Sequence, residues 1–95
     1  MIKGVTASGF HYELKEGIEK DWRLVQCLTK LKELEDSDSE EIEFINSMAT
    51  IEKLIFTDKG KALEKYLASK NNDVIPTDEM LKELLDILKN DSTKN

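Results

Sequence analysis

One stretch of alternating apolar and polar residues, with helical spacing everywhere after it, most constrains the fold of this chain. Phe10, Tyr12 and Leu14 occupy every second position between polar residues, which is the pattern of a strand with one buried face. One strand cannot satisfy its own backbone hydrogen bonds, so residues 9–14 need a partner strand. The candidates are the short segment 72–75 and the N-terminal arm of a second molecule.

Downstream of this strand, apolar residues recur at steps of three and four, which predicts amphipathic helices. Capping residues mark their ends: Ser37 with Glu40 forms a capping box, and Thr57-Asp58 and Thr77 are further caps. The expected helices cover about residues 18–34, 39–55, 58–71 and 78–89. The predicted fold class is mainly α, with about four helices and a short N-terminal β-strand or extended arm. We expect a flexible N-terminal arm (1–8), a single helical domain (9–89) and a disordered tail (90–95).

The composition of the chain disfavours some classes of binding partner. The 95 residues include 20 acidic and 14 basic side chains, and the net charge of -6 repels nucleic acid and anionic membrane surfaces. No window approaches the roughly 20 apolar residues of a membrane span, and no secretory signal is recognisable, so we expect a cytosolic protein. The charged share of 36% exceeds the usual ~25%, which predicts a thin core.

Candidate chemistry is sparse. His11 and Cys27 are the only residues of their kinds, which rules out the common zinc ligand sets and gives no motif for a cysteine nucleophile. The acidic run 33–41 lacks the glycine and the ligand spacing of a calcium loop. We therefore expect no catalytic, cofactor-binding or metal-binding residue and no small-molecule substrate. Cys27 is expected to be a small buried hydrophobe.

Aromatic residues are the remaining candidates for function. Trp22, the only tryptophan, lies on the apolar stripe of the first predicted helix, and we expect it in the core. Phe44 falls off the apolar stripe of the second predicted helix, so it either packs at a helix edge or belongs to a contact surface. The expected partner-binding residues are Phe10, Tyr12, Leu14 and Phe44, with completion of the core as the alternative for each.

Four motifs in a fixed order resemble the small tail assembly chaperones of long-tailed bacteriophages and prophages. The motifs are Ser8-Gly9-Phe10-x-Tyr12-Glu13-Leu14, Asp21-Trp22-Arg23-Leu24-Val25, Lys59-Gly60-Lys61-Ala62-Leu63-x-x-Tyr66-Leu67 and Val74-Ile75-Pro76-Thr77. The resemblance covers about residues 6–88. Where the family often has a second acidic residue before the tryptophan, this chain has Lys20. Where the family has a Leu-Gly pair leading into the third helix, this chain has Thr57-Asp58-Lys59-Gly60.

The resemblance implies a helical, non-enzymatic protein. Proteins of this family coat the tape measure protein in the cytoplasm of the bacterial host while the tail tube assembles, and they are absent from the mature virion. The implied partners are the tape measure protein and further copies of the chain itself. A soluble acidic protein could cover the apolar stripes of tape measure helices, which would otherwise aggregate.

Two other classes of function compete with this one. A small acidic regulatory or anti-host protein could bind an enzyme or a nucleic-acid-binding protein by mimicking the charge of DNA, which would require carboxylates in paired rows along one face. A small hydrolase would require a pocket that contains a strongly perturbed titratable group, and the sequence indicates none.

Overall fold

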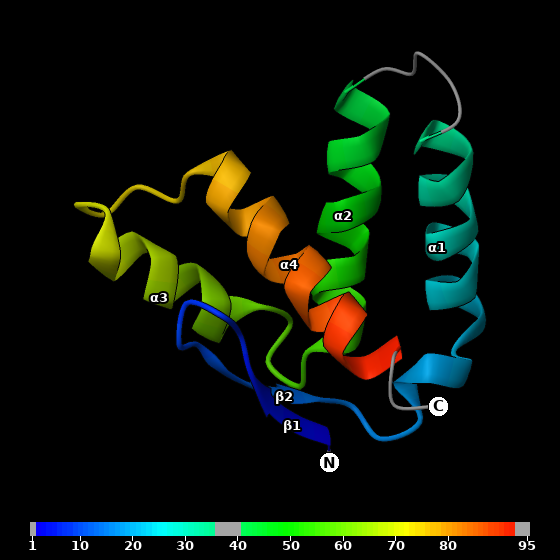
Figure 1. Cartoon of the computed structure of the whole chain (residues 1–95), viewed down its shortest axis with the longest axis horizontal. Helices are drawn as coiled ribbons and strands as arrows, with labels where there is room; N and C mark the ends of the chain where they lie inside the picture. Colours follow the sequence, from blue (N-terminus) through cyan, green and yellow to red (C-terminus); the bar gives the residue numbers. More distant parts are fainter. Residues whose placement is uncertain (1, 36–40, 93–95) are drawn as a thin grey trace.

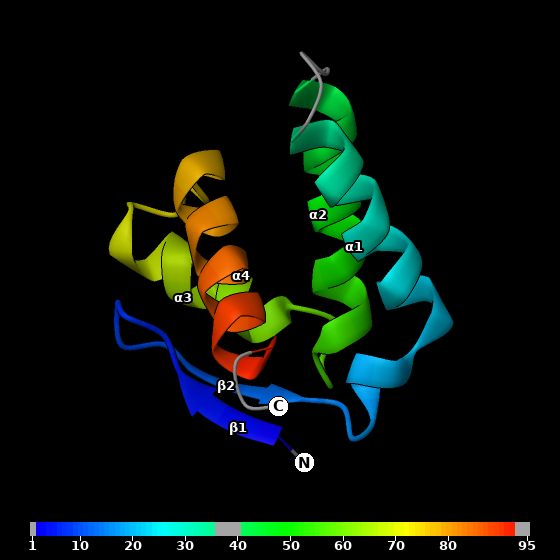
Figure 2. The same cartoon turned by 45° about the vertical axis from the view of Figure 1, so that its right-hand side comes forward.

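The computed structural model describes residues 2–35 and 41–92, which form a β-hairpin and two pairs of helices. The elements are β1 (Ile2–Val5), β2 (His11–Leu14), a 3-10 helix (Ile18–Lys20), α1 (Trp22–Glu35), α2 (Glu41–Ile55), α3 (Lys61–Lys70) and α4 (Thr77–Ser92). The predicted class, mainly α with four helices and a short N-terminal strand, is confirmed. Figure 1 shows α1 and α2 side by side and antiparallel, with the hairpin below the helices. Figure 2 shows α3 and α4 on the opposite side of the molecule from α1.

The core lies where α2, α3 and α4 meet the hairpin. Its most enclosed side chains all come from these helices: Met48, Ile51, Ile55, Leu63, Leu67, Leu84 and Ile87. The hairpin contributes Phe10, Tyr12 and Leu14 from below, and α1 adds Leu24 and Leu31 from the side. Burial of these apolar side chains is the main term that stabilises the arrangement.

The strand partner of β2 comes from the chain's own first residues. β1 pairs antiparallel with β2 in a register that places Ile2 opposite Leu14 and Gly4 opposite Tyr12. A side chain at position 4 would collide with the ring of Tyr12, so glycine is needed there. Both predicted partners, the segment 72–75 and a second molecule's arm, are therefore wrong for this pairing. Residues 2–5 are also a strand and not the flexible arm that we expected, because the Tyr12 ring packs over Gly4.

The other edge of β2 is tied to the end of α2. Leu14 forms an isolated antiparallel bridge with Phe56, and the Lys15 backbone N–H donates to the Ile55 carbonyl oxygen at 2.9 Å. The hairpin is thereby fixed to the turn between α2 and α3.

The first predicted helix is divided into two elements. A 3-10 helix at Ile18–Lys20 is followed by Asp21 in an extended conformation, and α1 begins at Trp22. The Asp21 carboxylate accepts the backbone N–H of Arg23 at 2.8 Å, which caps the helix. Because the helix is interrupted at Asp21, the burial of Ile18 does not determine which side of α1 faces the core.

The remaining helix ends follow their caps only in part. The Asp58 carboxylate accepts the backbone N–H groups of Gly60 and Ala62 at 3.1 and 2.7 Å, so it satisfies a free N–H group in the first turn of α3. The N-cap residue itself is Gly60, and neither Thr57 nor Asp58 occupies that position. Thr77 is the first residue of α4 and not its cap, since the Pro76 carbonyl accepts the Met80 N–H. Residues 90–92 continue α4, so the prediction of disorder from residue 90 is wrong for them. Residues 93–95 and the predicted capping box at 37–40 lie outside the described residues.

Candidate functional site

Three of the residues that we expected to contact a partner lie in the core. Phe10, Tyr12 and Leu14 are all buried. The ring of Phe10 meets Phe56 edge-on, with 6.4 Å between centroids, and lies 5.1 Å from the ring of Tyr66. The alternation correctly indicated a strand with one buried face, but that face packs on this chain's own helices. These three side chains complete the core, which was the alternative to a contact surface.

Phe44 lies apart from Phe10, Tyr12 and Leu14, in the first turns of α2. Its side chain is half-buried and packs against the core cluster. The structure therefore does not join Phe44 to the other three predicted contact residues in one surface.

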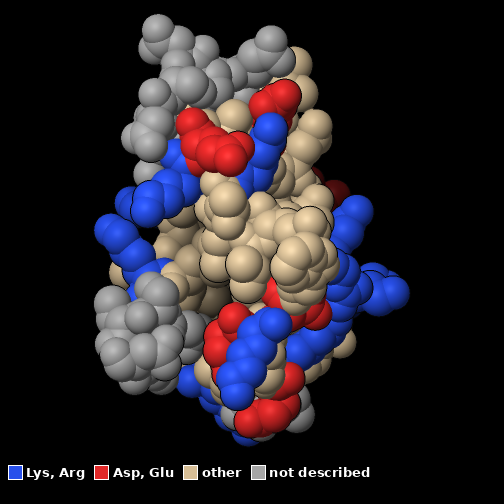
Figure 3. Space-filling model, turned by 90° about the vertical axis from the view of Figure 1, so that its right-hand side faces the viewer, with Lys and Arg blue, Asp and Glu red and all other residues tan. Residues whose placement is uncertain are grey.

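Trp22, which the sequence placed in the core, points outward and is 73% exposed. Val25 and Leu28 follow it at intervals of three residues on the same side of α1, and they are 44% and 39% exposed. We call these three residues the α1 face. Figure 3 shows uncharged side chains gathered in the middle of this side of the molecule, with Lys and Arg side chains to both sides. Exposed apolar side chains that adjoin one another indicate an interaction site more often than single ones do.

A second row of apolar residues explains why Trp22 points outward. Leu24, Leu31 and Leu34 are buried, and Cys27, half-buried between them, packs against the core. Their spacing of three, four and three residues is that of a seam between two packed helices. The apolar stripe predicted from helical spacing was Ile18, Trp22, Val25, Cys27, Leu28 and Leu31, which mixes residues of both rows and omits Leu24 and Leu34. If the row that begins at Leu24 had been assigned to the core by itself, Trp22, Val25 and Leu28 would have been predicted to be exposed.

The basic side chains of α1 lie on two different sides of the helix. Arg23 forms an ion pair with Asp21 at 2.8 Å, and the hydrogen bonds from Arg23 lower the pKa of Asp21 to about 2. Lys30 lies 3.6 Å from Glu43 of α2. Lys32 lies on the same side of α1 as Val25, about two helical turns further on. Arg23 and Lys30 line a hollow between α1 and α2 together with Asn46 and Thr50, so Lys32 is the basic residue of α1 that follows the α1 face.

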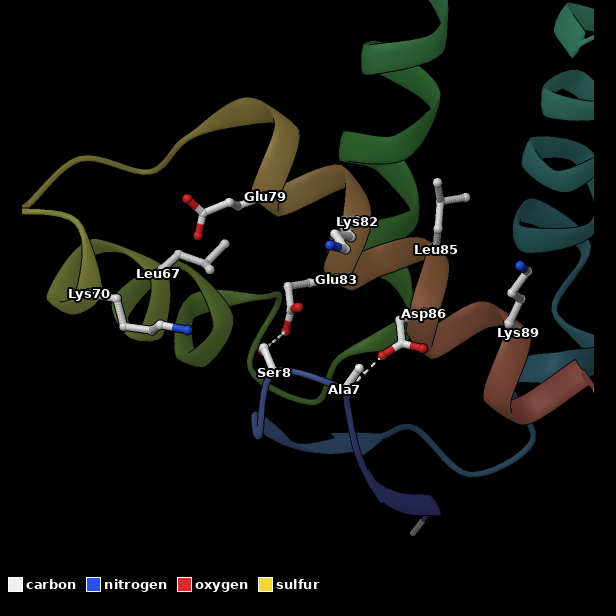
Figure 4. Close-up of a pocket in the computed structure, with 10 residues that line it drawn as sticks. All are labelled: Ala7, Ser8, Leu67, Lys70, Glu79, Lys82, Glu83, Leu85, Asp86 and Lys89. Carbon is white, nitrogen blue, oxygen red and sulfur yellow. Dashed lines mark hydrogen bonds between the residues drawn. The ribbon is translucent and has the colours of Figure 1, made fainter.

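A groove of about 570 Å³ lies between the hairpin turn, α3 and α4 (Figure 4). Its buried carboxylate, Glu83, accepts the hydroxyl groups of Thr6 and Ser8 at 2.8 and 2.9 Å. Asp86 accepts the backbone N–H of Ala7 at 2.7 Å. These acidic groups hold the hairpin turn against α4, so we assign the groove a structural role.

Glu52 is a perturbed titratable group that the sequence analysis missed. Its side chain is 6% exposed, and its Oε2 atom has no hydrogen-bond partner among the described residues. Burial first, and then the neighbouring Glu64 carboxylate, raise the pKa of Glu52 to about 8. Gly60 packs against the Glu52 carboxyl group so closely that a side chain at position 60 would collide with it. Glu52 lines neither the groove nor the α1 face, so it is a structural group of the α2–α3 junction.

The described residues contain no group of three or more His, Cys, Asp or Glu side chains placed to hold a metal ion. Cys27 is a free cysteine, and burial raises the pKa of its thiol, which disfavours the reactive thiolate. None of the helices within 2–35 and 41–92 is both long and apolar enough to span a bilayer.

Comparison with known proteins gave no match: neither a family model, nor a curated protein, nor a solved structure is similar enough to the chain to identify a relative. Among the described residues, the α1 face is the strongest candidate for a functional surface.

Proposed function

We propose that this chain is a non-enzymatic phage tail assembly chaperone that binds and solubilises the tape measure protein through the α1 face. The outward position of Trp22, beside Val25 and Leu28, is the observation that carries the proposal. The four motifs that resemble the chaperone family also support it, and one of them contains Trp22 and Val25. The α1 face replaces Phe10, Tyr12, Leu14 and Phe44 as the expected contact surface.

The energetics of the α1 face suit a reversible contact. Complete burial of the half-exposed Val25 and Leu28, together with Trp22 as an interfacial anchor, would contribute about 4 kcal/mol before the cost of association. Because association itself has a substantial entropic cost, a single contact of this kind is weak. A chaperone that coats a long client needs many such contacts along its length and must leave when the tail tube forms. The proposed place of action is the cytoplasm of the bacterial host, with no copy retained in the mature virion.

Co-expression with the tape measure protein tests the proposal. We expect more soluble tape measure protein in the presence of this chain, and loss of that gain when Trp22, Val25 and Leu28 are all replaced by serine. The matched control replaces Val74 and Ile75, which are exposed apolar residues between α3 and α4, and it should retain the gain. Equal insolubility of the tape measure protein with and without the chain would refute the proposal. The genomic position gives a second check, because a tail-tube gene upstream and a very long coiled-coil gene downstream are expected.

The alternative function, an acidic regulatory or anti-host protein, makes a different prediction. Binding through carboxylate rows would weaken steeply as salt is added, whereas apolar contact is comparatively tolerant of salt. On the side drawn in Figure 3, acidic and basic side chains are interspersed around uncharged surface and form no paired acidic rows. This arrangement favours the chaperone proposal on that side of the molecule.

A further inference from the structure

The turn between α2 and α3 holds three parts of the fold together. Leu14 of β2 bridges to Phe56 in this turn, and the Ile55 carbonyl oxygen at the end of α2 accepts the Lys15 N–H at 2.9 Å. The helix α3 begins directly after the turn, which Figure 1 shows beside β2. A change in this turn therefore affects the hairpin, α2 and α3 together.

The backbone of the turn is strained. Lys59 and Gly60 both have positive φ angles, of 61° and 88°. Glycine adopts this region at little steric cost, whereas a residue with a Cβ atom is disfavoured there, so Lys59 stores strain in the folded turn. The closed turn thus depends for its stability on the contacts around it.

The Glu52 carboxyl group is enclosed beneath this turn. The side chain is buried, and its Oε2 atom has no hydrogen-bond partner among the described residues. Gly60 lies so close to the carboxyl group that even a methyl group at position 60 would collide with it. A carboxylate here would lack the water and the hydrogen-bond donors that an anion needs. The closed turn therefore accommodates the neutral acid and disfavours the anion.

The charged groups around Glu52 add to this effect, with one exception. Burial is the largest cause that raises the pKa of Glu52, and the Glu64 carboxylate of α3 is the next. Asp58 in the turn acts in the same direction, whereas Lys53, the neighbour of Glu52 on α2, favours the anion. A second negative charge where α2 meets α3 would therefore repel the one on Glu64.

We propose that the α2–α3 junction is a proton-controlled latch, in which loss of the Glu52 proton to solvent opens the turn and releases the start of α3 from α2. In the closed state the neutral Glu52 carboxyl group lies under Gly60 and beside Glu64. In the open state the Glu52 carboxylate is hydrated, and the attachment of the hairpin at Phe56 is loosened with it. The latch goes beyond the proposed function and does not depend on which partner the chain binds.

Proton linkage gives the size of the effect. The pKa of Glu52 is about 8 in the closed junction, and in the open junction it has its ordinary value of 4.5. Between these values the open state has lost a proton that the closed state keeps. The equilibrium constant for opening should therefore rise about tenfold per pH unit from pH 5 and level off above about pH 8.

Amide hydrogen exchange followed by NMR measures this opening. The Glu64 N–H, which donates to the Gly60 carbonyl oxygen at 3.0 Å, reports on the first turn of α3, and the Lys15 N–H reports on the hairpin attachment. The amide of Ile87, in the middle of α4, reports on unfolding of the whole chain. After correction for the intrinsic exchange rate, the opening constants at Glu64 and Lys15 should rise about a hundredfold from pH 5 to pH 7. Dilute urea should leave them unchanged while it accelerates exchange at Ile87.

Two variants assign the effect to Glu52. Glu52→Gln keeps the side chain neutral at every pH, so the rise in the opening constant with pH should disappear. Glu19→Gln removes an exposed carboxylate from the 3-10 helix and should keep the rise.

Either of two results would overturn the inference. Opening constants at Glu64 and Lys15 that stay level from pH 5 to pH 8, or that still rise in Glu52→Gln, would show that this proton does not control the turn. Equal sensitivity of Glu64, Lys15 and Ile87 to urea would show that the junction opens only when the whole chain unfolds. The wild-type pH and urea series test the latch even if Glu52→Gln does not fold. They involve no partner, so they leave the chaperone proposal to its own test.

Discussion

The substitution Glu52→Gln should make the stability of this protein almost independent of pH between about pH 5 and pH 8. In the folded chain the pKa of Glu52 is raised to about 8, from the ordinary value of 4.5 that applies when the chain is unfolded. Between these values the folded state holds a proton that the unfolded state has lost. The proton on Glu52 therefore makes its full contribution to folding stability below pH 4.5, and that contribution declines as pH rises toward 8.

The size of the effect follows from the difference between the pKa values of Glu52 in the folded and unfolded chain. Each pKa unit corresponds to about 1.4 kcal/mol, so the wild-type protein should lose at most about 5 kcal/mol of unfolding free energy across it. Glutamine has nearly the same shape as protonated glutamate, and its amide N–H can donate to the Glu64 carboxylate. We expect the variant to match the wild type within about 1 kcal/mol at pH 5 and to exceed it by about 3 kcal/mol at pH 8.

Urea unfolding at a series of pH values, followed by far-ultraviolet circular dichroism, measures the stability of the wild type and of the Glu52→Gln variant. Circular dichroism is the suitable probe because Trp22 is already exposed and reports little on unfolding. Glu19→Gln removes an exposed carboxylate from the 3-10 helix and serves as the control, which should keep the wild-type pH dependence. A wild-type stability that stays constant from pH 5 to pH 8, or a Glu52→Gln variant as sensitive to pH as the wild type, would refute the reasoning.

Three further substitutions probe the fold. Gly60→Ala should destabilise the protein by about 2–4 kcal/mol in thermal or urea unfolding, because φ is positive at this position and a methyl group would meet the Glu52 carboxyl group. Trp22→Ala should change the unfolding free energy by less than about 0.5 kcal/mol while Leu24→Ala lowers it by about 2–4 kcal/mol; equal effects would contradict the assigned rotation of α1. Glu83→Ala removes the acceptor of the Thr6 and Ser8 hydroxyl groups and should cost about 1–3 kcal/mol, with faster amide hydrogen exchange in β1 as the local sign; unchanged exchange there would show that Glu83 does not hold the hairpin.

Local chemistry was enough to predict the types of element. The alternation of Phe10, Tyr12 and Leu14 indicated a strand with one buried face, and the spacing of apolar residues indicated four helices. Asp58 was predicted to cap α3, and its carboxylate accepts a free N–H group in the first turn of that helix, although the N-cap residue is Gly60. Each of these features depends on residues within one or two turns of each other, so the sequence alone determines them.

Tertiary contacts decided which surfaces are covered. Both apolar rows of α1 satisfy helical spacing, and packing against the neighbouring elements buries the row of Leu24 and leaves that of Trp22 exposed. Gly4 acquires its partner, Tyr12, only when residues 2–5 fold back onto β2. The burial of Glu52 depends in the same way on the approach of Gly60 and Glu64 from the far side of the α2–α3 turn. Periodicity is a property of one segment, whereas burial is a property of the pair of surfaces that meet, so the candidate binding face became visible only when the segments were packed together.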